Sequence, residues 1–220
     1  MRRITRYLAN IFYKPLLEKY LSKERQFTHN TIVLLISPQV FHPGFFFSTK
    51  LLLKEVMRLP LIGKKFLELG AGNGLIAIDA AKAGAIVTAT DINPEAIAYL
   101  LQNIATNDVE VTVIESDLFT MIPVQVFDII AINPPYYLKT PVTFKEYAWY
   151  CGENGEYFHG LFASLSNYID RNSVILMILC EGSDRELIGH IANSYDFEMS
   201  CISIRQNLIE KNYIFRVYPQ

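Results

Sequence analysis

The stretch from residue 65 to residue 78, KFLELGAGNGLIAI, constrains the fold of this chain more than any other. Its pattern indicates an apolar strand, a turn with three glycines and the start of a helix,. A second apolar segment at 85–90 follows that helix and leads to Asp91. In such a strand–turn–helix–strand unit, an acidic residue after the second strand can accept hydrogen bonds from ribose hydroxyls. The sequence therefore predicts a nucleotide-type ligand at this turn.

Apolar strand patterns and helical patterns alternate along most of the chain. Seven strands are predicted, near residues 65–69, 85–90, 110–114, 127–132, 173–180, 197–205 and 212–218,. Strands that alternate with helices form a parallel sheet with helices on both faces. We therefore predict an α/β fold, namely a Rossmann-like, doubly wound, mostly parallel seven-stranded sheet with an antiparallel C-terminal edge hairpin.

The N-terminal part of the chain, residues 1–49, is predicted to be a small helix and hairpin extension that covers the substrate. Residues 50–220 then form the main domain. The first 25 residues carry seven Lys or Arg against two Glu. Such a segment can contact RNA phosphates or an acidic protein face, or it can be the solvated face of a helix that packs on the domain. These alternatives stay open at this point.

The tetrapeptide Asn133-Pro134-Pro135-Tyr136 ends the strand predicted at 127–132. Its prolines cannot donate ladder hydrogen bonds, and the first proline biases Asn133 away from the helical region. The result is a rigid turn that offers the amide oxygen of Asn133, the carbonyl of Pro134 and the ring of Tyr136. Two acceptors and an aromatic face can hold a planar NH2 group. We therefore predict that Asn133, Pro134, Pro135 and Tyr136 form the catalytic turn.

The glycine turn favours one nucleotide-type ligand over another. Dinucleotide-binding folds usually carry Gly-x-Gly-x-x-Gly, which places a pyrophosphate on the helix N-terminus. In this chain the third glycine is Gly74, one residue early, and Leu75 occupies the position of the expected glycine. The acidic Glu68 ahead of the turn suits a ligand with an ammonium group. S-adenosylmethionine has an ammonium group, a sulfonium and no phosphate, so the sequence favours it over a nicotinamide cofactor.

Four segments resemble, in order, the motifs of class I S-adenosylmethionine-dependent methyltransferases. They are residues 68–74, Asp91, Asp117 with Leu118, and residues 133–136. The last segment resembles the subset that methylates nitrogen on amides or exocyclic base amines. Within that subset the chain is most similar to the HemK-type, small-domain N-methyltransferases with an Asn-Pro-Pro-Tyr motif. The resemblance runs from about Val40 to the C-terminus, and the segment before it is shorter than the N-terminal helical domain of release-factor methyltransferases in that group.

The resemblance also implies roles for individual residues. Asn133 and Pro134 would hold the substrate nitrogen, and Tyr136 would pack on the planar group that carries it. The residues that the resemblance implies for binding of S-adenosylmethionine are Glu68, Gly70, Ala71, Gly72, Asp91, Ile92, Asp117, Leu118 and Asn133.

The predicted function is methyl transfer from S-adenosylmethionine to an amide or exocyclic amino nitrogen of a macromolecule, with protein glutamine favoured. The alternative is methylation of adenine N6 or guanine N2 in RNA or DNA. A small-molecule N-methyltransferase and a non-catalytic scaffold that keeps the cofactor pocket are further alternatives. A nicotinamide-dependent enzyme ranks last because of the early glycine at Gly74.

Several other classes of protein are disfavoured by the sequence. No apolar stretch approaches the roughly 20 residues that span a bilayer, and no signal-peptide pattern is present. Cys151, Cys180 and Cys201 are too widely spaced to indicate a disulfide framework or a zinc site,. We expect a cytoplasmic protein with a protein or RNA substrate, no metal and no membrane partner, and the sequence predicts no oligomeric state.

Overall fold

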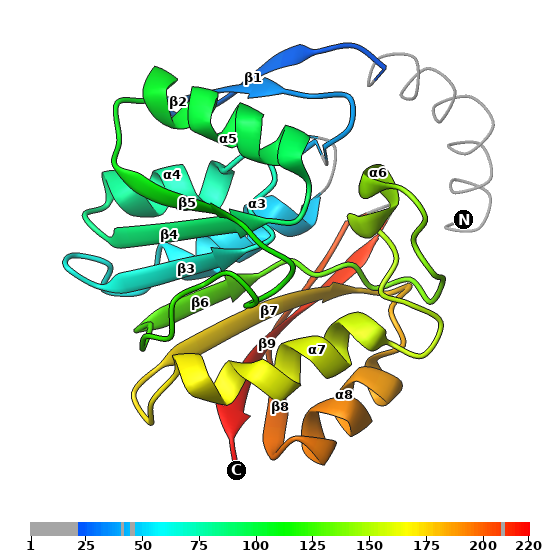
Figure 1. Cartoon of the computed structure of the whole chain (residues 1–220). Coiled ribbons are helices and arrows are strands. Elements are labelled where there is room, and N and C mark those ends of the chain that lie inside the picture. The colour runs from blue at the N-terminus through cyan, green and yellow to red at the C-terminus, as the bar shows by residue number, and fades with distance from the viewer. Residues whose placement is uncertain (1–21, 41, 45–46, 208–209) are drawn as a thin grey trace.

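The computed structural model describes residues 22–40, 42–44, 47–207 and 210–220 of the 220-residue chain. Figure 1 shows these residues in colour, with helices on either side of the main sheet. The helix predicted within residues 1–21 lies outside the described residues.

A seven-stranded sheet forms the centre of the molecule, in the order β5-β4-β3-β6-β7-β9-β8 (Figure 1). Strands β3 to β7 run parallel to one another, whereas β9 pairs antiparallel with both β7 and β8. The predicted fold class is therefore confirmed. The strands are β3 (Lys65–Leu69), β4 (Ile86–Asp91), β5 (Val111–Glu115), β6 (Ile129–Ile132), β7 (Val174–Cys180), β8 (Phe197–Gln206) and β9 (Lys211–Pro219).

Helices cover both faces of this sheet and divide the core in two (Figure 1). Alternate residues of the central strands point to opposite faces, as Ile129 and Ile130 do in β6,. Both faces are apolar, which explains why the central strands are continuous hydrophobic runs. One face packs on α3 (Phe47–Val56), α4 (Leu75–Lys82) and α5 (Pro94–Thr106). The other packs on α7 (Glu156–Leu165), η2 (Ser166–Tyr168) and α8 (Arg185–Ser194).

The strand order reverses direction between β3 and β6. From β3 the chain builds outward through β4 to β5, and it then returns to the other side of β3 to form β6 and β7. Open α/β sheets bind ligands in the crevice outside the carboxyl ends of their strands at such a reversal. The short helix α6 (Phe144–Tyr147) lies beyond this edge of the sheet (Figure 1).

A separate two-stranded hairpin, β1 (Arg25–His29) and β2 (Ile32–Ile36), packs against α5. Alternate residues of β2 are buried, and they extend the core of the main domain. The predicted hairpin is therefore present. Its docking depends on two asparagines one helical turn apart, Asn103 on α5 and Asn107 at its C-cap, whose side chains bond the backbone of β2.

In the part of the chain that the structure describes, no helix is both long and apolar enough to cross a membrane. The three cysteines are free, and Cys151 and Cys180 are buried.

Candidate active site

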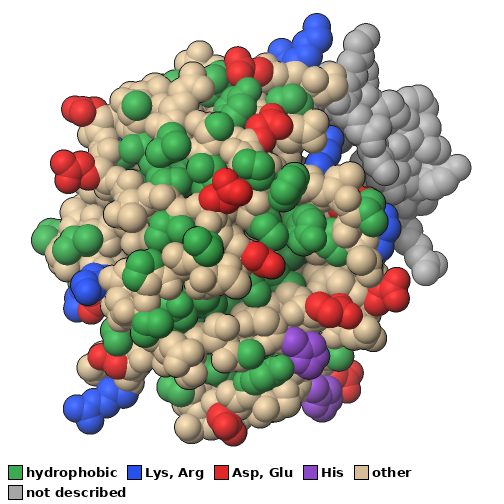
Figure 2. All heavy atoms as spheres, in the orientation of Figure 1, with side chains coloured by type: hydrophobic (Ala, Val, Ile, Leu, Met, Phe, Trp, Pro, Cys, Tyr) green, Lys and Arg blue, Asp and Glu red, His purple; other side chains and the backbone are tan. Residues whose placement is uncertain are grey.

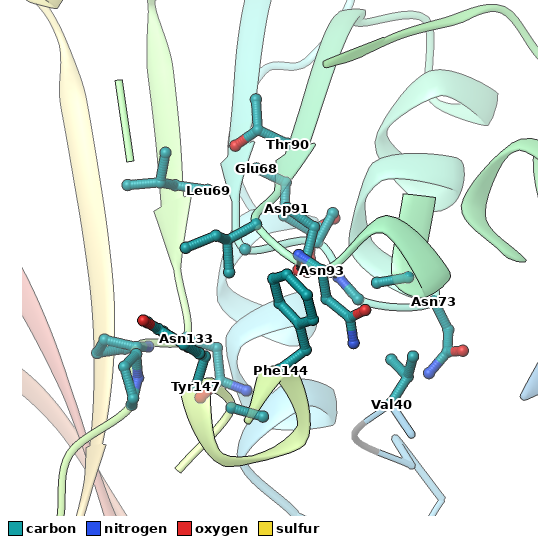
Figure 3. A pocket seen from close by; sticks show the side chains of 18 of the residues that line it. Val40, Glu68, Leu69, Asn73, Thr90, Asp91, Asn93, Asn133, Phe144 and Tyr147 are labelled. Atoms are coloured by element: carbon teal, nitrogen blue, oxygen red, sulfur yellow. Dashed lines mark hydrogen bonds between the residues drawn. The ribbon is translucent and has the colours of Figure 1, made fainter. Parts of the chain in front are cut away.

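Every residue predicted to bind cofactor or substrate lines one cleft at the carboxyl edge of the sheet. The predicted residues that meet there are Glu68, Gly70, Ala71, Gly72, Asp91, Ile92, Asp117, Leu118, Asn133, Pro134, Pro135 and Tyr136. They come from the ends of β3, β4, β5 and β6, which are brought together by the sheet although they are far apart in sequence. Figure 3 shows Glu68 and Asp91 together on one side of this cleft and Asn133 on the other.

The glycine turn adopts a conformation that other residues avoid. Gly70, Gly72 and Gly74 have φ angles of 77°, 54° and 84°, all in the left-handed region,. The backbone nitrogen of Ala71 donates to the carbonyl of Thr90 at 2.7 Å, which fastens the turn to β4. A Cβ on Gly70 would meet no atom within 4 Å, so the cleft stays open beside this residue.

Gly74 has a packing role. It is the N-cap of α4 and does not line the cleft. A Cβ at this position would lie 2.3 Å from the Cδ1 atom of Leu100 on α5. The early third glycine therefore lets α5 approach the turn closely.

Glu68 is a buried carboxylate at the end of β3, with 6% of its surface exposed. Its Oε2 atom accepts a hydrogen bond from the backbone nitrogen of Ala77 at 2.7 Å, which satisfies one of the free N–H groups in the first turn of α4,. Burial, with a smaller contribution from the charge of nearby Asp91, raises the pKa of Glu68 to about 8 against the lowering effect of the Ala77 N–H,. A cationic group beside Glu68 would favour its ionised form.

Asp91 shapes the glycine turn from the end of β4. Its two carboxylate oxygens accept hydrogen bonds from the backbone nitrogens of Gly72 at 2.8 Å and Asn93 at 2.9 Å. Burial raises the pKa of Asp91, and these backbone donors oppose the shift. A carboxylate has about four lone-pair sites, so Asp91 can still accept two hydroxyl donors from a ligand.

The turn that carries Asp117 and Leu118 is held by Ser116. The Ser116 hydroxyl donates to the Leu118 carbonyl at 2.9 Å and accepts from the backbone nitrogen of Met121 at 3.1 Å. Leu118 has a φ of 47°, an uncommon conformation for a residue with a side chain,. The turn therefore projects Leu118 and Asp117 into the cleft under local strain,.

Asn133 and the prolines close the opposite side of the cleft. The Asn133 amide nitrogen donates to the hydroxyls of Thr49 at 3.3 Å and Ser48 at 3.4 Å. In the described part of the chain, no donor bonds the Asn133 side-chain oxygen or the Pro134 carbonyl. This turn therefore presents two acceptors to the cleft.

Tyr136 is buried beside those acceptors and is 8% exposed. Its ring meets that of Tyr137 edge to face, with centroids 4.9 Å apart. Burial raises the pKa of the Tyr136 hydroxyl, and the neighbouring Cys180 thiol raises it further. Tyr136 therefore stays neutral and presents an aromatic surface rather than a base.

The loop after Tyr136 forms a cover over the cleft. The backbone nitrogens of Tyr136 and Tyr137 both donate to the carbonyl of Trp149, at 3.2 and 3.0 Å, which closes the base of this loop. At its tip, α6 places Phe144 and Tyr147 against the cleft. Figure 3 shows the ring of Phe144 lying between Asn133 and Asn93.

Sequence reasoning missed several residues of the cleft. Tyr157 at the start of α7 lines it, and burial raises the pKa of its hydroxyl, with Asp91 and Asp117 adding to the shift. Thr49, Phe144 and Tyr147 line it as well. For Thr49, the available signal was the Ser-Thr pair ahead of the apolar run at 51–53, because such residues are common at the start of a helix,.

The model of the methyltransferase small domain family matches residues 32–147. The match spans more than half of the 220 residues, so the chain belongs to the methyltransferase small domain family.

Individual relatives support this assignment. The putative protein N5-glutamine methyltransferase of Methanocaldococcus jannaschii is 34% identical over 154 residues, which are 67% of this chain and 75% of that protein. The release factor glutamine methyltransferase of Flavobacterium psychrophilum is 38% identical over 89 residues, which are 39% of this chain and 31% of the relative. This chain thus matches less than a third of the second relative.

A solved structure has the same fold. The T. thermophilus 16S rRNA N2 G1207 methyltransferase in complex with AdoMet and guanosine superposes with a TM-score of 0.65 at 16% identity. The superposition covers 90% of this chain and 50% of that chain. The family match and the relatives identify this chain as an S-adenosylmethionine-dependent methyltransferase, and the superposition shows its Rossmann-like fold.

The residues of the cleft fit S-adenosylmethionine. The buried carboxyl group of Glu68 and the half-buried carboxyl group of Asp91 suit a ligand with a cationic end and ribose hydroxyls, and the open space beside Gly70 admits it. A pyrophosphate fits less well, because the backbone nitrogens of Ala71 and Gly72 already bond Thr90 and Asp91. The nicotinamide alternative is therefore disfavoured by the structure as well.

Proposed function

We propose that this enzyme methylates the side-chain amide nitrogen of a glutamine in a protein. The name of the M. jannaschii relative supports this acceptor, and so does the name of the F. psychrophilum relative. The observation that carries the proposal is the pair of acceptors at Asn133 and Pro134, at the mouth of a cleft that fits the cofactor.

The proposed roles in cofactor binding follow from the charges and contacts. Glu68 faces the ammonium group of the methionine portion, beside the open backbone at Gly70, Ala71 and Gly72. Asp91 accepts the ribose hydroxyls, because its remaining lone pairs are free for them,. Ile92, Asp117 and Leu118 flank the adenine, and Asn133 borders both ligands.

The proposed role of the catalytic turn is orientation. When bound, S-adenosylmethionine supplies an electrophilic methyl group on its sulfonium. A primary amide nitrogen is a poor nucleophile, because its lone pair is delocalised into the carbonyl. The oxygens of Asn133 and Pro134 accept hydrogen bonds from the two N–H groups of the substrate amide, and Tyr136 packs on the plane of that amide. The substrate nitrogen is thereby held in line with the methyl group for transfer. The turn supplies no strong base, and the proton leaves to water after transfer.

A second candidate is an exocyclic amine of an RNA base, which presents a similar planar NH2 group. The basic composition of residues 1–25 favours it, as does the RNA named for the T. thermophilus enzyme. The face in Figure 2 favours protein. On that face, Lys and Arg side chains lie toward the edges, apolar side chains gather in the centre, and acidic side chains are spread across it.

Two further parts of the proposal concern setting and domain organisation. Residues 1–49 cover the acceptor ahead of the catalytic domain at 50–220, and residues Gln39, Val40 and Pro43 of that segment line the cleft. The enzyme works in the cytoplasm, and three free cysteines are in keeping with a reducing compartment,.

The test is methyl transfer from radiolabelled S-adenosylmethionine into a lysate, followed by separate protease and RNase treatment. We expect the label to be lost with protease and to be recovered as methylglutamine after enzymatic digestion. Label lost only with RNase would replace protein with RNA as the substrate. Label in the low-mass fraction would indicate a small-molecule acceptor.

Asn133→Ala should separate catalysis from cofactor binding. We expect turnover to fall at least ~100-fold, because the acceptor nitrogen loses an orienting oxygen, with the cofactor Kd changed by less than about threefold. Asp91→Ala should instead weaken cofactor binding in calorimetry. Lys54→Ala, an exposed change on α3, is the control. Normal turnover in Asn133→Ala would contradict the proposed role of the turn.

A further inference from the structure

The side chain of Asn133 is anchored by residues that lie 84 and 85 positions earlier in the chain. Its amide nitrogen donates to the Thr49 hydroxyl at 3.3 Å and the Ser48 hydroxyl at 3.4 Å. Both hydroxyl residues are buried, at 9% and 3% exposure, and both lie in the first turn of α3. We call Ser48 and Thr49 the hydroxyl pair.

The hydroxyl pair holds the Asn133 amide by its nitrogen end. A side-chain amide is planar, and two contacts to its nitrogen restrict rotation of the whole group. With the nitrogen against Ser48 and Thr49, the oxygen occupies the opposite corner of the group. Only that orientation presents a hydrogen-bonding oxygen to the N–H groups of the substrate that receives the methyl group. The reverse orientation would place two N–H groups against it.

Glu210, in the turn between β8 and β9, stabilises the first turn of α3. The backbone nitrogen of Phe47 donates to the Glu210 carboxylate at 3.1 Å. This N–H is one of the groups that a helix start leaves without an internal partner, and a negative charge there is favourable. The Glu210 backbone nitrogen in turn donates to the Asn207 side chain at 2.7 Å. The helix end that carries the hydroxyl pair is therefore stabilised by the turn between β8 and β9.

We propose that Ser48 and Thr49 are positioning residues for methyl transfer, which orient the Asn133 amide so that its oxygen receives the acceptor N–H. This inference rests on the proposed role of Asn133. Loss of the hydroxyl pair frees the amide to rotate, so fewer enzyme molecules hold the acceptor in the reactive orientation. We expect the cost to fall mainly on turnover, because Glu68 and Asp91 supply the main proposed contacts to the cofactor.

The first experiment compares Thr49→Val, Ser48→Ala and the double variant with Thr49→Ser. Valine has the shape of threonine without the hydroxyl, whereas serine keeps the hydroxyl. We expect kcat to fall about 10-fold in Thr49→Val and about 100-fold in the double variant, with KM and the cofactor Kd within about twofold. Thr49→Ser should recover turnover to within about threefold of wild type. Lys54→Ala, on the exposed side of α3, controls for general effects on the helix.

A second experiment needs neither substrate nor cofactor. Selective 15N labelling of asparagine allows the Asn133 side-chain NH2 signals to be identified as those absent from Asn133→Ala. We expect these protons to exchange slowly in the wild type and Thr49→Ser, and rapidly in the double variant. The result holds whether the acceptor is a protein or RNA, so it separates failure of this inference from failure of the proposed function.

Either of two results would overturn the inference. One is wild-type exchange of the Asn133 amide protons in the double variant. The other is turnover in Thr49→Ser as low as in Thr49→Val, because it would trace the loss to packing rather than to the hydroxyl.

Discussion

At the scale of single residues, the carboxyl groups of the site each have a structural role and also line the cleft. Asp91 holds the glycine turn by accepting from Gly72 and still lines the cleft. Glu68 completes the first turn of α4 through Ala77 and still places a carboxyl group in the cleft. Because each side chain is fixed by a structural bond, the cleft is formed before a ligand enters.

Gly74→Ala should destabilise the fold more than an ordinary glycine substitution. The new Cβ would combine a left-handed φ of 84° with a contact 2.3 Å from the buried Leu100. We expect a loss of about 2–4 kcal/mol in the free energy of unfolding, measured by urea denaturation.

The matched control for that change is Gly63→Ala. Gly63 has a φ of 70°, and a Cβ added there would meet no atom within 4 Å, so only the backbone cost of about 1–2 kcal/mol applies,. Equal losses in the two variants would mean that Leu100 moves aside freely and that close packing does not require Gly74.

At the scale of elements, two asparagine side chains of α5 and its C-cap bond the backbone of the N-terminal hairpin as a neighbouring strand would. The Asn103 side chain accepts from the Leu35 nitrogen at 2.7 Å and donates to the Leu35 carbonyl at 3.0 Å. Asn107 makes the same two bonds with Val33, at 3.0 and 2.7 Å. One helical turn advances about 5–6 Å and two strand residues about 6.5–7 Å, so the two spacings match closely. Asn103 and Asn107 therefore satisfy backbone groups of β2 that a further strand would otherwise bond.

Asn103→Ala should release the middle of β2. The substitution leaves the Leu35 N–H and carbonyl without these partners and also removes a bond to the Asn73 carbonyl beside the glycine turn. We expect a loss of roughly 2–4 kcal/mol and faster hydrogen exchange at Leu35. Gln102→Ala, at the exposed neighbouring position, should change neither. Unchanged exchange at Leu35 in Asn103→Ala would show that apolar packing alone holds the hairpin.

At the scale of the whole molecule, the buried carboxyl of Glu68 links stability to pH. Its pKa is raised from 4.5 to about 8 in the folded protein, so between these values the folded state binds a proton that the unfolded state has lost. This contribution to stability is complete below pH 4.5 and is lost as the pH rises to about 8,. The lowered pKa of His42 acts in the opposite direction near pH 6.5.

Comparison of wild type with Glu68→Gln isolates this effect. The wild type should lose stability relative to the variant by up to about 1.4 kcal/mol per pH unit between about pH 5 and pH 8. Urea midpoints across this range measure the difference. In the wild type, cofactor affinity should rise with pH over the same range, because a cationic ligand favours ionised Glu68. Parallel pH profiles for the two proteins would contradict the raised pKa.

Much of the fold and most of the cleft could be predicted from local patterns. The strand at 65–69, the left-handed glycines and the rigid turn at Asn133 depend on residues that are neighbours in sequence. Since parallel strands bring their carboxyl ends to one edge, predicting strand ends also predicted that Glu68, Asp91 and Asn133 would meet,.

Local sequence patterns were enough to predict the alternation of strands and helices, the carboxyl-edge motifs and the class of chemistry, because periodicity and backbone restrictions act over a few residues. The three-dimensional fold was needed to establish that Ser48 and Thr49 bond Asn133, that Asn103 bonds Leu35, and that β9 lies between β7 and β8. Those contacts join segments tens of residues apart. Their partners are chosen by which surfaces pack together, and no local pattern records that choice.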